Sequence, residues 1–128
     1  MSVQPPKSFD TFDFGLARAV LEQLIDQFDA LPIGRLDSAT INKVFAEQGV
    51  YQLFLANRLV YVRKTSKALP DSLLRHLHLL SERKDIHLAD VGFKCVSISR
   101  NWMDYVDQTS LVAYYKGLGL CGWNDDNP

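Results

Sequence analysis

The sequence has few cysteines and no long apolar run, and both absences narrow the classes of protein that it can encode. Cys95 and Cys121 are the only cysteines in 128 residues, and neither belongs to a C-x-x-C motif. We therefore expect neither a disulfide framework nor a zinc ribbon. We do expect a reducing, cytoplasmic location. No stretch approaches the roughly 20 apolar residues that a membrane helix needs. Residues 1–12 lack the apolar core of a secretory signal, so no membrane partner is expected.

Net charge is also small, at −1, but it is unevenly distributed along the chain. Residues 58–100 contain nine Lys and Arg against four Asp and Glu, whereas both flanking regions are acidic. A cationic middle could present one positive face to a phosphate backbone. The alternative is a solvated surface on which the positive charges are merely scattered.

The length of 128 residues and an apolar content of 47% fit one compact domain. Apolar positions recur at helical spacing in several segments separated by turn signals. The predicted helices span residues 11–28, with Asp10 or Thr11 as the N-cap, then about 37–48, 71–82 and 104–115.

Two adjacent apolar runs, residues 49–56 and 59–64, are joined by Asn57-Arg58, which is typical of a two-stranded hairpin. Residues 91–98 alternate in polarity and predict a third strand. The expected fold is therefore α+β, with a small three-stranded antiparallel sheet flanked by helices.

The predicted helix 71–82 has two distinguishable sides. Leu73, Leu77 and Leu80 fall at spacings that form a buried stripe. Arg75 and His76 fall on another side, together with Ser72, one turn before each of them. His78 points away from that group, so His76 and His78 cannot share a metal ion.

Several motifs occur in a characteristic order. Gly49-Val50-Tyr51 and Tyr61-Val62-Arg63 lie on the two hairpin strands, a helix with His76 follows, and Trp123-Asn124 comes near the end. This arrangement resembles the GIY-YIG nuclease family, most nearly its restriction-endonuclease branch. The resemblance implies an N-terminal helical extension in residues 1–48, a GIY-YIG-like domain in 49–124 and a tail in 125–128.

The resemblance also implies a chemistry, namely phosphodiester hydrolysis assisted by one Mg²⁺ or Mn²⁺ ion. Tyr51, Tyr61 and His76 match the family's catalytic positions, and Asn124 matches the asparagine of its terminal motif. One tyrosine would activate the attacking water.

Three positions depart from the family pattern. Ser72 stands where the family has a phosphate-binding arginine, Gln108 where it has a metal-binding glutamate, and Arg63 where it has glycine. Serine lacks the bidentate charge of a guanidinium, and a glutamine carbonyl lacks the carboxylate charge that Mg²⁺ prefers. Arg75 or Arg63 could supply the missing positive charge. Asp107 could supply a carboxylate, although neighbouring helix positions point about 100° apart.

Three functions remain open at this point. The first is a nuclease-derived, catalytically impaired DNA-binding protein. Its expected DNA contacts are Arg58, Arg63, Lys64, Lys67, Arg75 and Asn124. The second is an active, metal-dependent endonuclease that uses Arg75 or Arg63 as a substitute clamp. The third is a protein-interaction module, such as an inhibitor, a nuclease subunit or a homodimer, that uses apolar surface near residues 106–115.

Overall fold

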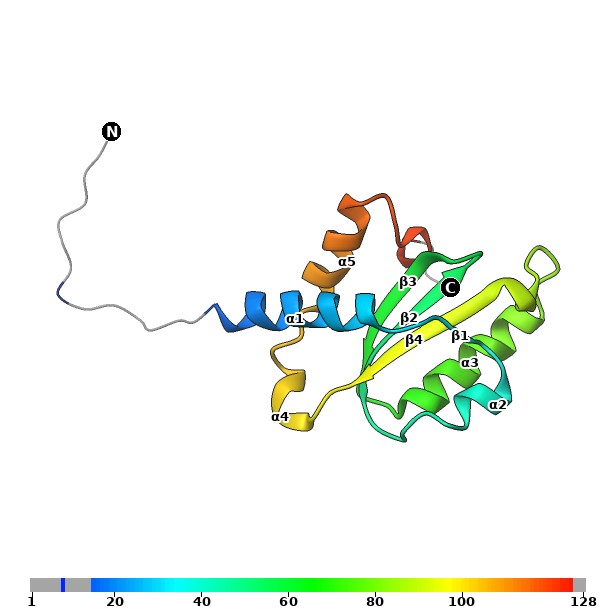
Figure 1. The fold of residues 1–128 in the computed structure, drawn as a ribbon, viewed down its shortest axis with the longest axis horizontal. Coiled ribbons are helices and arrows are strands. Elements are labelled where there is room, and N and C mark those ends of the chain that lie inside the picture. Colours follow the sequence, from blue (N-terminus) through cyan, green and yellow to red (C-terminus); the bar gives the residue numbers. More distant parts are fainter. Residues whose placement is uncertain (1–7, 9–14, 126–128) are drawn as a thin grey trace.

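The computed structural model describes residue 8 and residues 15–125, and it has the α+β architecture that the sequence predicts. One antiparallel sheet runs through the centre in the strand order β1-β4-β2-β3. Figure 1 shows α1 and α5 on one side of this sheet and α2 and α3 on the other. We call these two sides the α5 face and the α3 face.

The central hairpin consists of β2 (Gly49–Leu55) and β3 (Arg58–Thr65). Its turn is Ala56-Asn57, one residue earlier than predicted, and both residues have positive φ, at 50° and 65°. Two consecutive left-handed residues are typical of the type I′ turn, whose twist matches that of paired strands. Tyr51 and Tyr61 lie on neighbouring strands, as predicted, and Tyr51 is opposite Arg63.

The prediction of three strands was wrong, because the sheet has a fourth, β1 (Gly34–Arg35), paired with β4 (Val91–Ser97). A strand of two residues is too short to produce an alternating pattern. The Pro-Ile-Gly sequence at residues 32–34 therefore indicated only the end of the preceding helix. Gly92 permits the pairing, since a Cβ atom there would lie 2.8 Å from the Gly34 carbonyl oxygen.

The helices match the sequence predictions in part. The structure contains α1 (Leu16–Ala30), α2 (Ser38–Ile41), α3 (Leu69–Ser81), α4 (Arg100–Met103), α5 (Gln108–Gly117) and the short 3₁₀ turns η1 (Leu88–Asp90) and η2 (Gly122–Asn124). The proposed N-caps Asp10 and Thr11 lie outside the described residues. The helix expected over 37–48 ends at Ile41, and Asp37 caps its start by accepting a 2.8 Å hydrogen bond from the Thr40 N–H.

The last predicted helix, over 104–115, begins later than expected. Asp107 accepts hydrogen bonds from the N–H groups of Thr109 and Ser110, so α5 starts at Gln108. An aspartate in this position satisfies donors that a helix start leaves unpaired. Residues 104–107 therefore form the link between α4 and α5 rather than a first helical turn.

Each face of the sheet has its own core. The α5 face buries Leu24, Phe28, Val50, Val62, Val96 and Leu111, among others. The α3 face buries Leu53, Leu69, Leu73, Leu80 and Phe93 together with Tyr51 and Tyr61. Strand β4 sends Phe93 and Cys95 to the α3 face and Val96 to the α5 face, as its alternation predicts. Among the described residues, no helix is long and apolar enough to cross a membrane.

Candidate functional site

Tyr51, Tyr61 and His76 meet on the α3 face, and we call them the Tyr–His cluster. The Tyr51 hydroxyl and His76 Nε2 are 2.8 Å apart and share a hydrogen bond. The His76 ring centroid lies 5.4 Å from that of Tyr51 and 5.2 Å from that of Tyr61. Three polar side chains that the sequence places on different elements thus converge on one point between the hairpin and α3.

The local sequence explains why these side chains converge. Residues 51 and 61 point to the α3 face because side chains alternate along each strand. The buried stripe of α3 consists of Leu69, Leu73, His76 and Leu80, so His76 replaces the predicted Leu77, which is half-buried. Spacings of four, three and four residues place the imidazole on the side of the helix that packs against the sheet.

Burial disfavours the charged forms of Tyr51 and His76. Tyr51 is 2% exposed, Tyr61 6% and His76 7%. Loss of solvent, assisted by the nearby charges of Arg75 and Arg63, lowers the pKa of His76 to about 4. Burial also raises the pKa of Tyr51 well above its usual value, with Tyr61 adding to the effect. A protonated phenol bonded to a neutral imidazole is a poor base for activating water.

Cationic side chains border the cluster. Arg63 Nη1 donates a 3.3 Å hydrogen bond to the Tyr61 hydroxyl, and Arg63 as a residue is exposed. Arg75 is exposed on α3 beside His76, and its charge acts on both Tyr51 and His76. Lys67 is exposed in the loop between β3 and α3. Arg63 and Arg75 are thus the two cations whose charges act on Tyr51 and His76.

Ser72, at the position of the family's arginine, has a local partner. Its hydroxyl lies 3.3 Å from the hydroxyl of Thr65, at the end of β3. Thr65 Oγ1 also accepts a hydrogen bond from the Lys67 N–H. These contacts connect the first turn of α3 to the loop before it. They supply no positive charge.

Gln108 and Asp107 do not fit the metal site that the resemblance implies. Gln108 Oε1 accepts a 2.9 Å hydrogen bond from the Lys64 N–H, and Asp107 caps α5. Among the described residues, no three His, Cys, Asp or Glu side chains lie close enough together to hold a metal ion. The oxygen donors of these two side chains already accept bonds from the protein, so we derive no step through a metal ion.

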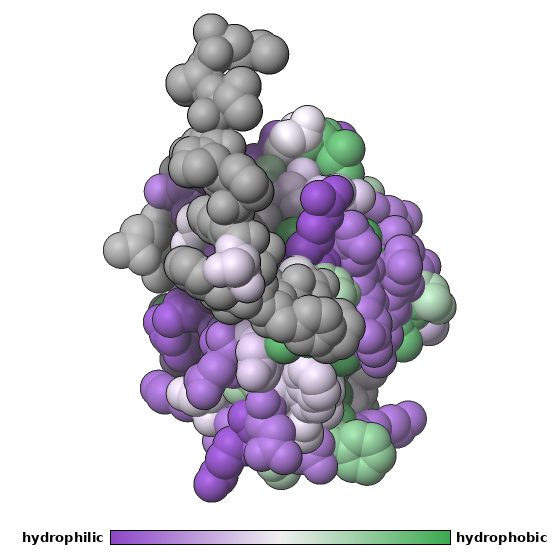
Figure 2. All heavy atoms as spheres, turned by 90° about the vertical axis from the view of Figure 1, so that its left-hand side faces the viewer, coloured by the Kyte–Doolittle hydropathy of each residue, from purple (hydrophilic) through white to green (hydrophobic). Residues whose placement is uncertain are grey.

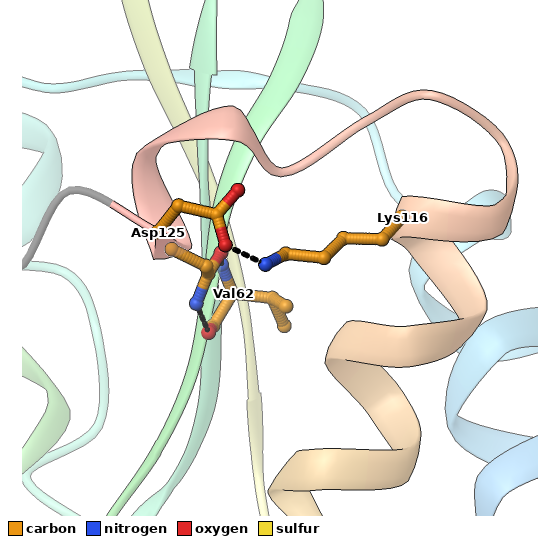
Figure 3. A network of polar contacts seen from close by, with 4 residues as sticks. Val62, Lys116 and Asp125 are labelled. Carbon is orange, nitrogen blue, oxygen red and sulfur yellow. Dashed lines mark hydrogen bonds and ion pairs between the residues drawn. The ribbon is translucent and has the colours of Figure 1, made fainter.

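Asn124 covers the outer edge of β3. Its side-chain amide accepts a 3.0 Å hydrogen bond from the Val62 N–H and donates one of 2.9 Å to the Val62 carbonyl. An ion pair between Lys116 and Asp125 ties the same segment to α5 (Figure 3). Gln108 bonds to the N–H of Lys64, two residues further along β3. Side-chain amides therefore occupy backbone groups of an edge strand that would otherwise be open to pairing.

The remaining predicted DNA contacts are held by internal bonds. The Lys64 ammonium donates to the Val106 carbonyl at 3.0 Å, and Arg58 Nη2 donates to the Gly119 carbonyl at 2.7 Å. Arg58 also lies at the turn end of the hairpin, whereas Arg63 lies near its other end. Of the predicted cationic contacts, only Arg63 and Arg75 act on the Tyr–His cluster, whereas Arg58 lies apart from it.

Gly49, the first residue of the hairpin motif, is required by packing. A Cβ atom there would lie 2.0 Å from the Val96 carbonyl oxygen of β4. No side chain can be accommodated that close to a backbone atom. The glycine thus lets β2 and β4 pair up to the start of the strand that carries Tyr51.

Sequence reasoning missed one buried polar pair on the α5 face. Gln52 Nε2 donates a 3.0 Å hydrogen bond to the hydroxyl of Tyr115. Both side chains are almost fully buried, at 2% and 4% exposure. The available signal was a glutamine inside an otherwise apolar strand, because a buried amide needs a partner.

Near α1 and α4, the visible surface of the described residues shows its hydrophobic side chains separately (Figure 2). On that side, Figure 2 shows hydrophobic side chains as separate green spots among hydrophilic ones, over the part that the described residues form. Val106 and Tyr115, which bound the apolar surface expected over 106–115, are buried. Trp102 and Tyr105 are exposed and pack against each other at 5.5 Å between ring centroids.

Comparison with known proteins gives no assignment: no protein-family model matches this chain, and no curated protein matches it.

Proposed function

We propose that this chain is a GIY-YIG-like DNA-binding protein that has lost efficient phosphodiester hydrolysis. The observation that carries the proposal is the Tyr–His cluster, in which Tyr51, Tyr61 and His76 meet beside a hairpin and the helix that follows it. The order of these elements and the side chains that converge on them support the resemblance described above.

The cationic rim supports a role in binding phosphate. Arg63 and Arg75 are exposed and act on the cluster, and Lys67 is exposed in the loop that joins β3 to α3. Guanidinium groups bind phosphate oxygens through paired N–H donors. A DNA backbone laid along β3 and the first turns of α3 would meet all three side chains.

Three features support impaired hydrolysis. Ser72 and Gln108 replace the charged groups of the family and are engaged with Thr65 and Lys64. Burial raises the pKa of the Tyr51 phenol above its ordinary value, so this phenol gives up its proton less readily than an exposed tyrosine. Burial of the Tyr–His cluster also restricts the access of water to the phenol. These features favour binding over the active-endonuclease alternative.

Fluorescence anisotropy with a short labelled duplex, and with a branched DNA of the same sequence, tests the binding. Affinity should fall steeply between roughly 50 and 200 mM salt, because each phosphate contact contributes about −0.9 to the slope of log K against log salt. Arg63→Ala and Arg75→Ala should each reduce that slope by about one unit. Arg18→Ala, which removes an exposed cation from α1, is the matched control and should leave the slope unchanged. Binding that is absent, or independent of salt, would contradict the proposal.

A plasmid assay with Mg²⁺ or Mn²⁺ tests the loss of hydrolysis. The wild-type protein should cleave no faster than Tyr51→Phe. The double variant Ser72→Arg with Gln108→Glu should gain metal-dependent cleavage, since a glutamate oxygen can still accept the Lys64 N–H bond. A double variant that folds and binds DNA but stays inactive would refute the positional match of these two sites. Rapid cleavage by the wild-type protein would refute the impairment.

A further inference from the structure

A second candidate site lies on the α5 face, on the opposite side of the sheet from the Tyr–His cluster. A cavity of about 370 Å³ opens between the C-terminal end of α1, the hairpin and α5. Pockets that hold small ligands start at roughly this size. Gln52 and Tyr115, the buried polar pair, both line it, as do Arg58 and Lys94.

The buried pair leaves hydrogen-bonding capacity directed at this cavity. The Gln52 amide uses one polar atom in its bond to the Tyr115 hydroxyl. Among the described residues, its other polar atom has no partner, and the Tyr115 hydroxyl has no second partner. No fully buried side-chain polar atom of the described residues lacks a partner, so this remaining bonding capacity is open to water in the cavity. A ligand in the cavity could complete these bonds.

Two cations are held in fixed positions beside the pair. Lys94 Nζ donates a 2.8 Å hydrogen bond to the Phe28 carbonyl and lies 5.3 Å from the centre of the Phe54 ring. Arg58 Nη2 donates to the Gly119 carbonyl at 2.7 Å. Each bond uses one N–H, so an ammonium with three donors and a guanidinium with five retain free donors.

The charge balance of the lining favours an anion. Among the described residues that line it, Asp29 is the single carboxylate, against Arg58 and Lys94. Phe54, Leu59 and Leu120 supply an apolar wall. A molecule with an apolar body, one hydrogen-bonding group and one negative charge matches this combination of side chains.

We propose that this cavity binds a small organic anion. Its carboxylate or phosphate contacts Arg58 and Lys94, its apolar body packs against Phe54, and its polar substituent bonds to Gln52 and Tyr115. Because Gln52 and Tyr51 point to opposite faces, this site is separate from the one proposed to bind DNA, and either proposal can fail without the other.

Two-dimensional ¹H–¹⁵N NMR of the full chain tests the proposal, with 4-hydroxybenzoate and phenyl phosphate as probes at matched ionic strength. Saturable shifts are expected for residues 52–59, 94 and 115. The probe that binds with the higher affinity shows whether the site prefers a carboxylate or a phosphate group. The uncharged 4-hydroxybenzamide should cause much smaller shifts. Shifts that sodium chloride reproduces, meaning an adventitious ion only, or shifts that map elsewhere, would overturn the proposal.

Variants at exposed positions sharpen the test without disturbing the core. Arg58→Gln should weaken binding about tenfold, the effect of losing one charge-assisted hydrogen bond. Asp29→Asn should strengthen binding, because it removes a negative charge from the lining. Lys43→Gln, a distant exposed cation, is the control and should have no effect. Equal weakening by Arg58→Gln and Lys43→Gln would overturn the proposal.

Discussion

The two faces of the sheet each bury a tyrosine that is hydrogen-bonded to a polar partner, and they differ in what lies beside that pair. On the α3 face, Tyr51 and His76 are packed against the Tyr61 ring and the leucines of α3. On the α5 face, Gln52 and Tyr115 border a cavity of about 370 Å³. Tyr51 and Gln52 are adjacent in β2 but belong to different kinds of pair. We call the pair on the α3 face closed, because side chains surround it, and the pair on the α5 face open, because it borders a cavity.

This difference indicates that the contribution of a buried polar pair to the free energy of unfolding depends on whether water can reach the pair. In the closed pair, loss of one partner leaves the other unbonded in the core, which is costly. In the open pair, water from the cavity can replace a lost partner. Stability should therefore depend strongly on the α3-face pair and weakly on the α5-face pair.

The largest expected effect is the response of the α3 face to acid. In the unfolded chain His76 takes up a proton near pH 6.5, but in the folded protein only near pH 4, so stability falls as the pH drops through this window. A shift of this size corresponds to about 3 kcal/mol of unfolding free energy. Urea unfolding at pH 7 and pH 4 measures it. His76→Leu should remove most of the difference, whereas the exposed control His78→Gln should keep it.

Tyr51→Phe should destabilise the protein by about 1 to 3 kcal/mol at pH 7, because it leaves His76 Nε2 buried without its partner. Urea unfolding measures this loss. Tyr105→Phe, on an exposed ring, is the control and should change stability by less than about 0.5 kcal/mol. A negligible effect of Tyr51→Phe would mean that the pair on the α3 face is open to water.

Gln52→Leu should have a smaller effect, below about 1 kcal/mol, because the Tyr115 hydroxyl can bond to water in the cavity. The same substitution should raise the pKa of Tyr115 further from its present value of about 12, because burial raises that pKa and the Gln52 hydrogen bond partly lowers it again. Urea unfolding and ultraviolet titration of the phenol measure both quantities. If Gln52→Leu lowered the free energy of unfolding as much as Tyr51→Phe does, the proposed difference between the two faces would be wrong.

Gln108→Glu should have the smallest effect, within about 0.5 kcal/mol at pH 7, since a carboxylate oxygen also accepts the Lys64 N–H bond. Gln108→Leu removes the acceptor and should cost about 1 kcal/mol. Thermal unfolding of both variants compares them. Equal stabilities would show that the bond at the edge of β3 contributes little.

Much of the fold follows from local patterns. The hairpin was predicted to within about one residue, and helix α3 was predicted over 71–82 and found over 69–81. Strand β1 was missed because two residues carry no periodicity. The start of α5 was misplaced because Asp107 was interpreted as a helical residue, whereas it is the N-cap. Elements whose position depends on a single capping residue or a single strand pairing are the hardest to predict from a sequence.

The sequence by itself determined the class of the fold and the face to which each strand residue points, because alternation along a strand and the period of a helix are local properties. It thereby placed Tyr51 and Tyr61 on one face and Gln52 on the other. Only the tertiary structure decided that His76 is buried against Tyr51, that Gln108 bonds to the backbone of Lys64, and that Gln52 meets Tyr115 beside a cavity. These contacts join residues 25 to 63 positions apart, and their geometry is set by how the helices pack on the sheet.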